Sequence, residues 1–160
     1  MINIDLREAL QSSGKVFRFE YDGMPELQEI VFSRPLKLNA KYSSIKEGIH
    51  VYGGFNTVIE VKCTRCLECV KYPINVSFDV MFKTTAKDDD DYIYSGESLE
   101  LDKLVYDEII LNIPQQVLCN DDCKGICQVC GGNLNNATCD CDKKQIADNN
   151  NPFSKLKGIF

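Results

Sequence analysis

The sequence has few of the residues that an enzyme active site needs. It contains a single histidine, His50, so a catalytic set of serine, histidine and aspartate has only one candidate base. His50 stands between Ile49 and Val51 in an expected strand, and we interpret it as a surface residue. No glycine-rich loop of the kind that cradles a phosphate is present. We therefore expect a protein that is not an enzyme.

Long apolar stretches and an excess of positive charge are also missing. No segment approaches the ~20 apolar residues that cross a bilayer, and charged residues interrupt the first residues, unlike a secretory signal. The formal net charge is −6, which disfavours a general electrostatic grip on nucleic acid. We expect a cytoplasmic protein with no membrane contact and no small-molecule substrate. The partners compatible with this charge are a basic protein, or RNA that is contacted through a local basic patch.

The chain is rich in cysteine, and its nine cysteines fall into two groups. Three lie close together at Cys63, Cys66 and Cys69, and six lie between residues 119 and 141: Cys119, Cys123, Cys127, Cys130, Cys139 and Cys141. In a reducing cytoplasm disulfides are rare, and an odd number of cysteines cannot all pair. Metal ligation is the usual explanation for CxxC pairs in that setting.

The spacing predicts structural zinc sites. Cys127 and Cys130 have the two-residue spacing of a zinc knuckle, and Gly131 and Gly132 can take the positive φ that such a turn uses. Since four thiolates complete one site, the simplest division gives one zinc ion to the last four cysteines and a second ion to four earlier ones. The first set is Cys127, Cys130, Cys139 and Cys141, and the second is Cys63, Cys66, Cys119 and Cys123.

This division leaves Cys69 free and has alternatives. In one alternative Cys123 replaces one of the later ligands of the C-terminal site. The run Cys63-Thr-Arg-Cys66-Leu-Glu-Cys69 also resembles the beginning of a ferredoxin cluster motif, but no fourth cysteine follows soon after it. A dithiol redox site would normally stand at a helix N-terminus in a βαβ unit, whereas we expect the strands around this run to be antiparallel and joined as a hairpin.

Hydrophobic periodicity predicts an α+β fold. Alternating apolar and polar residues predict strands at 15–21, 36–41, 55–61 and 74–82, with a further extended run at 30–32. Apolar spacing predicts a helix over 102–112, ended by Pro114. Residues 1–14 read as a short helix or an extended arm, residues 86–97 as an exposed acidic loop, and Asn151 as the start of a short terminal helix.

The predicted architecture is an antiparallel β-sheet body with one or two packed helices and a C-terminal cysteine-rich zinc-binding segment. We place the body at 1–118, the zinc-binding segment, packed on the body, at 119–142, and a tether with a short helix at 143–160. Cys63, Cys66 and Cys69 then lie in the turn of a hairpin.

These motifs, in this order, resemble the YceD-type large ribosomal RNA subunit accumulation proteins. The resemblance rests on four runs: Cys63-Thr-Arg-Cys66-Leu; Leu101-Asp102-x-Leu104-Val105-x2-Glu108-x2-Leu111-x2-Pro114; Cys119-x3-Cys123-Lys-Gly-Ile-Cys127-x2-Cys130-Gly-x-Asn-Leu-Asn-x3-Cys139-x-Cys141; and Asn151-Pro152-Phe153-x2-Leu156. The likeness is dense in the second half. Ile126 and Gln128 stand where leucine and proline are common, and Cys69 is extra.

The resemblance implies a bacterial, cytoplasmic, non-catalytic factor in large-subunit ribosomal RNA accumulation, processing or ribosome assembly. From the residues themselves we expect its partner to be a large-subunit ribosomal protein, an assembly factor or 23S-type RNA. Local RNA contact is expected through lysines near the zinc end: Lys124, Lys143, Lys144, Lys155 and Lys157. The alternative is a cysteine-based redox enzyme or a nuclease acting on precursor RNA.

Overall fold

The computed structural model describes residues 1–86 and 91–141. Their elements, in chain order, are β1 (Asn3–Asp5), α1 (Arg7–Gln11), β2 (Val16–Gly23), β3 (Val31–Ile45), β4 (Gly48–Lys62), β5 (Cys69–Lys83), β6 (Tyr92–Ile93), β7 (Ser98–Glu100) and α2 (Asp102–Asn112). The chain forms two compact units. Unit 1 comprises 1–61 with 71–115, and unit 2 comprises 62–70 with the described residues from 116 to 141.

Unit 1 is built on a five-stranded sheet in the order β2-β3-β4-β5-β6. The pairs β2–β3 and β3–β4 are antiparallel. Along β5 the predicted alternation holds, because Ile74, Val76 and Phe78 are buried while the residues between them are exposed. The expected α+β architecture is therefore confirmed, and so is the predicted helix, which is α2.

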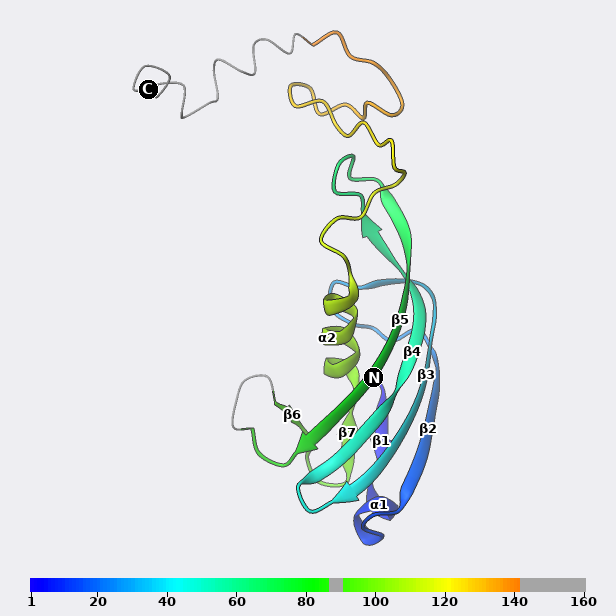
Figure 1. Ribbon diagram of the computed structural model, residues 1–160, viewed down its shortest axis with the longest axis vertical. Helices are drawn as coiled ribbons and strands as arrows, with labels where there is room; N and C mark the ends of the chain where they lie inside the picture. Colours follow the sequence, from blue (N-terminus) through cyan, green and yellow to red (C-terminus); the bar gives the residue numbers. More distant parts are fainter. Residues whose placement is uncertain (87–90, 142–160) are drawn as a thin grey trace, which may run out of the picture. The chain divides into compact units, whose positions relative to one another are not determined.

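One face of the sheet carries the hydrophobic core of unit 1. Figure 1 shows α2 and the small antiparallel sheet β1–β7 lying against this face. Leu104, Val105 and Ile109 of α2 are fully buried there, together with Ile4 of β1 and Leu99 of β7. Ile4 and Leu99 are directly paired across the two short strands. The first residues of the chain thus supply both a strand, β1, and a short helix, α1.

The prediction for residues 86–97 was wrong in part. Residues 92 and 93 form β6, which pairs in parallel with the end of β5. The ring of Tyr92 packs against Phe82, with 5.3 Å between centroids. Burial of aromatic surface therefore outweighs the polar character of the neighbouring aspartates at this point.

Glycine is required where β4 crosses the middle of the sheet. The strand runs continuously through Gly53 and Gly54. A Cβ added at Gly53 would lie 2.2 Å from the carbonyl oxygen of Asn39, which is closer than any side chain can approach. Gly48 and Gly54 approach the backbones of Phe82 and Val76 on β5, so β4 and β5 run antiparallel as a hairpin.

Unit 2 contains all nine cysteines and little regular structure. Buried cysteines 63, 66 and 123 form its hydrophobic cluster, against which Val70 and Leu118 pack. The two segments of unit 2 are joined through Thr64, whose N–H donates a hydrogen bond to the carbonyl of Val117 over 2.9 Å. Such a small unit buries too little apolar surface to be stable without further cross-links.

Candidate metal centre

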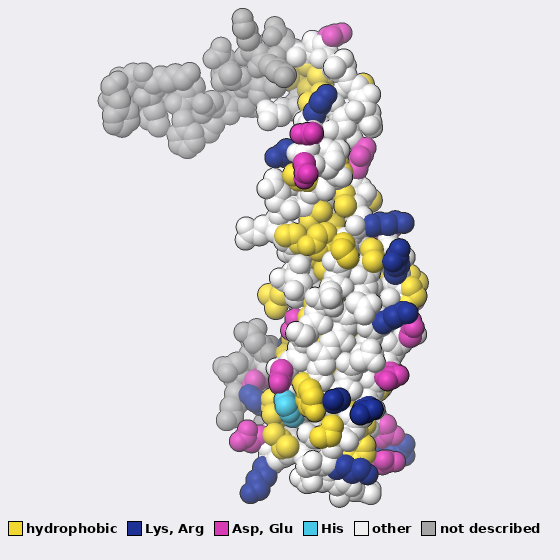
Figure 2. Space-filling model, turned by 45° about the vertical axis from the view of Figure 1, so that its right-hand side comes forward, with side chains coloured by type: hydrophobic (Ala, Val, Ile, Leu, Met, Phe, Trp, Pro, Cys, Tyr) yellow, Lys and Arg dark blue, Asp and Glu magenta, His cyan; other side chains and the backbone are white. Residues whose placement is uncertain are grey.

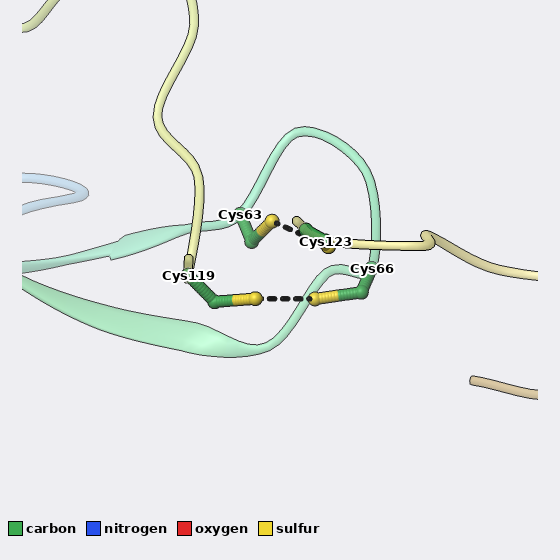
Figure 3. Close-up of side chains that lie close together, drawn as sticks. All are labelled: Cys63, Cys66, Cys119 and Cys123. Atoms are coloured by element: carbon green, nitrogen blue, oxygen red, sulfur yellow. Dashed lines mark hydrogen bonds between the residues drawn. The ribbon is translucent and has the colours of Figure 1, made fainter. Parts of the chain in front are cut away.

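Four cysteines from two distant segments meet in unit 2. Cys63 and Cys66 come from the turn after β4, and Cys119 and Cys123 from the segment after α2. Figure 3 shows their side chains directed toward a common centre, with Sγ–Sγ distances of 3.8 Å for Cys63 and Cys123 and 3.5 Å for Cys66 and Cys119. We call these four residues the first quartet. All four Sγ atoms lie within 4.8 Å of one another.

A second quartet lies further along the chain and consists of Cys127, Cys130, Cys139 and Cys141. Its four Sγ atoms also lie within 4.8 Å of one another. Cys69 belongs to neither quartet, and its side chain is exposed. All nine cysteines are free thiols in the structure. The structure therefore brings together the same two sets of four that the spacing predicted.

The dimensions of both quartets suit a tetrahedral metal ion. Sulfur atoms bound at about 2.3 Å around a tetrahedral ion lie about 3.8 Å apart, whereas a disulfide needs about 2.05 Å. A set of four thiolates fills all positions of such an ion and leaves none open, which is typical of a structural site. Either quartet could hold one ion.

The turn that carries Cys63 has the form of a zinc knuckle. The Cys63 N–H donates to the carbonyl of Glu68 at 2.8 Å, and the Leu67 N–H donates to the carbonyl of Cys63 at 3.0 Å. Leu67 has a φ of +63°. The turn therefore closes on itself and points both sulfur atoms to the same side.

The turn that carries Cys127 is held in the same way. The Cys127 N–H donates to the carbonyl of Gly132 at 2.8 Å, and the Gly131 N–H donates to the carbonyl of Cys127 at 2.9 Å. Gly131 has the positive φ that was predicted, +71°, whereas Gly132 does not. The N–H of Val129 points at the sulfur of Cys127, 3.4 Å away. This is the environment in which a thiolate is stabilised by backbone dipoles.

Negative charge is divided unevenly within the first quartet. Burial works against the charged form of Cys63, but backbone N–H groups of Cys66, Arg65 and Cys119 outweigh it and lower the pKa to about 6. The sulfur atoms of Cys123 and Cys66, together with burial, raise the pKa of Cys119 to about 12. A cation in the centre would stabilise all four thiolates and displace the remaining protons.

The second quartet has the same asymmetry. Backbone N–H groups of Cys130 and Val129 lower the pKa of Cys127 to about 6. The sulfur of Cys130, followed by burial, raises the pKa of Cys141 to about 12. In each quartet, binding of a dication would therefore release the proton of the thiol whose pKa is raised.

Two asparagine side chains donate to ligand sulfur atoms of the first quartet. The amide of Asn135 lies 3.4 Å from Sγ of Cys123 and lowers the pKa of that thiol. The amide of Asn120 lies 3.6 Å from Sγ of Cys119. Sequence reasoning missed both roles. The available signal was the clustering of asparagines between ligand cysteines, since amide donors commonly support metal ligands.

The remaining predicted positions lie outside the quartets. His50, on unit 1, has its Nε2 2.6 Å from Oδ1 of Asp79, and its side chain is 32% exposed. Of the predicted lysines only Lys124 is described, and its backbone N–H donates to Oδ1 of Asn135. Residues 143, 144, 155 and 157, and the expected terminal helix from residue 151, lie outside the described residues. No described helix combines the length and the apolar character that crossing a bilayer requires.

Comparison with known proteins places the match on the cysteine-bearing part of the chain. The family model "Large ribosomal RNA subunit accumulation protein YceD" matches residues 51–160. An uncharacterised protein of Mycobacterium leprae is 26% identical over 117 residues, covering 68% of this chain and 54% of that protein. A chloroplastic YCED homolog 1 of Zea mays, named as a large ribosomal RNA subunit accumulation protein, is 24% identical over 161 residues, covering 79% of this chain and 54% of that protein.

The uncharacterised protein YlbN of Bacillus subtilis is 28% identical over 121 residues, covering 65% of this chain and 67% of that protein. The chain spans about half the length of the mycobacterial and maize relatives. No solved structure matches the chain significantly.

Proposed function

The chain belongs to the YceD family of large ribosomal RNA subunit accumulation proteins, and on that premise we propose that it is a non-catalytic binding factor in large-subunit ribosomal RNA accumulation, processing or ribosome assembly. It acts in the bacterial cytoplasm, where thiols stay reduced and can bind metal. Its zinc ions are structural, and the surface that they stabilise is used for binding.

The observation that carries this proposal is the closed, all-sulfur composition of both quartets. Cys63, Cys66, Cys119 and Cys123 together offer four ligand atoms within 4.8 Å, and the second quartet does the same. Zinc suits four thiolates, and a four-thiolate site lacks the open position that a catalytic zinc needs for water. When bound in the first quartet, the ion would cross-link two segments that the sequence places more than fifty residues apart.

Elsewhere in residues 1–86 and 91–141 the candidate base is already engaged. His50 pairs with the exposed carboxylate of Asp79 on the sheet of unit 1. Ser43 stands opposite His50 across β3 and β4, but no hydrogen bond joins Ser43 to His50 or to Asp79 in the described part of the chain.

Charge favours a basic protein as partner. The chain carries −6, and four thiolates on one dication leave a further −2 at each quartet. On the face shown in Figure 2, Lys and Arg side chains stand among Asp and Glu and form no continuous basic surface. A ribosomal protein or a basic assembly factor is attracted by such a surface, whereas the phosphate backbone of RNA is repelled by most of it.

Local RNA contact has a structural candidate on unit 1. The residues that line a hollow of about 430 Å³ on the outer face of the sheet include Arg18, Glu20, Asn39, Lys41 and Tyr52. Lys41 and Arg18 are directly paired across β2 and β3. Two adjacent cations beside an aromatic ring can hold a phosphate and stack a base.

Affinity capture of the tagged full chain, with and without nuclease, tests the proposal. We expect large-subunit ribosomal proteins or assembly factors to be recovered equally well after nuclease treatment. Recovery that vanishes with nuclease would overturn the protein partner in favour of RNA. In that event R18A/K41A should abolish recovery, and K15A/K71A, which removes two lysines outside the hollow, is the matched control.

A separate assay tests the alternative function, a cysteine-based redox enzyme or a nuclease that acts on precursor RNA. Purified zinc-loaded chain is incubated with precursor large-subunit RNA, and we expect no cleavage. Replacement of Cys69, the one cysteine outside both quartets, should leave RNA maturation in cells unchanged. Cleavage by the purified protein, or loss of maturation in C69S, would reject the non-catalytic assignment.

A further inference from the structure

The loop between the ligand pairs of the second quartet reaches into the first quartet. This loop, residues 131–138, joins Cys130 to Cys139. It carries Asn135, whose Nδ2 lies 3.4 Å from Sγ of Cys123, a member of the first quartet. One side chain therefore connects the two quartets, although it is a ligand of neither.

Asn135 is held in a single orientation by its neighbours. Its Oδ1 accepts a hydrogen bond from the Lys124 N–H at 2.8 Å, which fixes Nδ2 as the donor to sulfur. Its own N–H and its Nδ2 both donate to Oδ1 of Asn133 at 2.9 Å. An amide locked at both ends is preorganised to donate to a thiolate.

The same loop also supports the first knuckle from outside. The amide of Asn133 donates to Oε1 of Glu68 at 2.7 Å, and the carbonyl of Glu68 accepts the N–H of Cys63. Asn136 adds a longer contact of 3.4 Å to the same carboxylate oxygen. The position of the loop thus bears on Cys63 as well as on Cys123.

Backbone hydrogen bonds complete the connection. The Ile126 N–H donates to the carbonyl of Arg65 at 3.1 Å, and the Leu134 N–H donates to the carbonyl of Gly125 at 2.9 Å. Gly125 has a φ of +75°, and a Cβ there would lie 3.1 Å from the Arg65 carbonyl oxygen. The two knuckles therefore share a contact surface within unit 2.

We propose that the two quartets bind metal with positive coupling, and that Asn135 is the positioning residue that transmits it. A metal ion in the second quartet ties both ends of loop 131–138 and so holds the Asn135 amide against Cys123. That donor stabilises the negative charge remaining on the metal-bound thiolate. Because coupling is reciprocal, metal in the first quartet strengthens binding in the second by the same factor. This inference rests on the metal-binding part of the proposed function.

The coupling factor is measurable with Co²⁺ as the probe. Reduced, metal-free full-length chain is titrated against a competing chelator, with sulfur-to-cobalt absorption and native mass spectrometry as readouts. C139S/C141S gives the affinity of the first quartet alone, and C63S/C66S gives that of the second alone. The overall two-ion constant of the wild type divided by the product of these two constants is the coupling factor, which we expect to be about 10.

Asn135→Ala removes the donor while keeping all eight ligands. We expect N135A to load two Co²⁺ ions with a coupling factor near 1. Asn120→Ala is the matched control, because Asn120 also donates an amide to a sulfur of the first quartet but lies between Cys119 and Cys123, outside the loop. N120A should weaken the first quartet and leave the coupling factor at its wild-type value.

The outcomes separate this inference from the proposal on which it rests. Failure of both ligand-deleted variants and of the wild type to bind Co²⁺ would reject the metal sites themselves. Normal loading of both quartets with a coupling factor near 1 in the wild type would reject coupling alone. A wild-type factor that persists in N135A would show that Asn135 does not transmit it.

Discussion

Leu67 occupies the position in the first knuckle that Gly131 occupies in the second. Each is the fourth residue after the first cysteine of its turn and donates its N–H to the carbonyl of that cysteine. Each has a positive φ, +63° for Leu67 and +71° for Gly131. A residue with a Cβ is strained in this conformation by about 1–2 kcal/mol. Because Leu67 is 57% exposed, little burial offsets that strain.

Substitutions at these two positions should therefore differ in their effect on stability. No atom lies within 4 Å of a Cβ placed on Gly131, so G131A adds backbone strain alone. We expect it to lower the free energy of unfolding of the zinc-loaded chain by about 1 kcal/mol. L67G removes the strain but makes the unfolded chain more flexible, so it should be neutral or slightly stabilising. Urea unfolding measures both, and G131A as stable as wild type would contradict the expectation.

Metal content distinguishes the ninth cysteine from the other eight. Cys69 is exposed and lies outside both quartets. C69S should retain two zinc ions per chain, whereas C130S should retain one, because three thiolates bind zinc more weakly than four. Zinc per chain is measured by plasma mass spectrometry after purification under reducing conditions. A reduced zinc content in C69S would mean that the ligand sets are divided differently.

Zinc retention should depend on pH in a defined direction. The pKa of Cys119 and that of Cys141 are each raised to about 12 by neighbouring cysteine sulfurs. Their protons must leave when a dication binds, so lowering the pH favours the protonated, metal-free form. We expect zinc to pass to a chromogenic chelator increasingly as the pH falls from about 8 to about 5. Transfer that is independent of pH would show that the metal does not depend on thiolates.

The larger strands and the long helix of unit 1 were predictable because their signals are local. In β5 the buried positions Ile74, Val76 and Phe78 alternate with exposed polar ones, and this pattern is visible in the sequence itself. Helix α2 follows the expected apolar spacing at Leu104, Val105 and Ile109, which are buried, although Ile110 and Leu111 are exposed. The cysteine quartets were predictable from spacing and number, since two sites of four leave a single residue over.

The features that escaped prediction depend on distant partners. Strands β1 and β7 are three residues long and pair Ile4 with Leu99, and no local pattern identifies so remote a partner. The parallel strand β6 depends on the packing of Tyr92 against Phe82. The role of Asn135 depends on a fold of the loop that places an amide at a sulfur, and sequence reasoning saw only a residue that tolerates turns.

Asp102, at the start of α2, is hydrogen-bonded to the residue that precedes β1. Its Oδ1 accepts the N–H of Ile2 at 2.8 Å, and Ile2 is fully buried. D102A leaves that donor without its partner and should lower the free energy of unfolding by about 1–3 kcal/mol. D102N keeps an oxygen acceptor of the same shape and should recover most of the loss. Thermal unfolding of zinc-loaded variants measures both, and equal losses in D102A and D102N would assign the effect to the charge of Asp102 instead of this hydrogen bond.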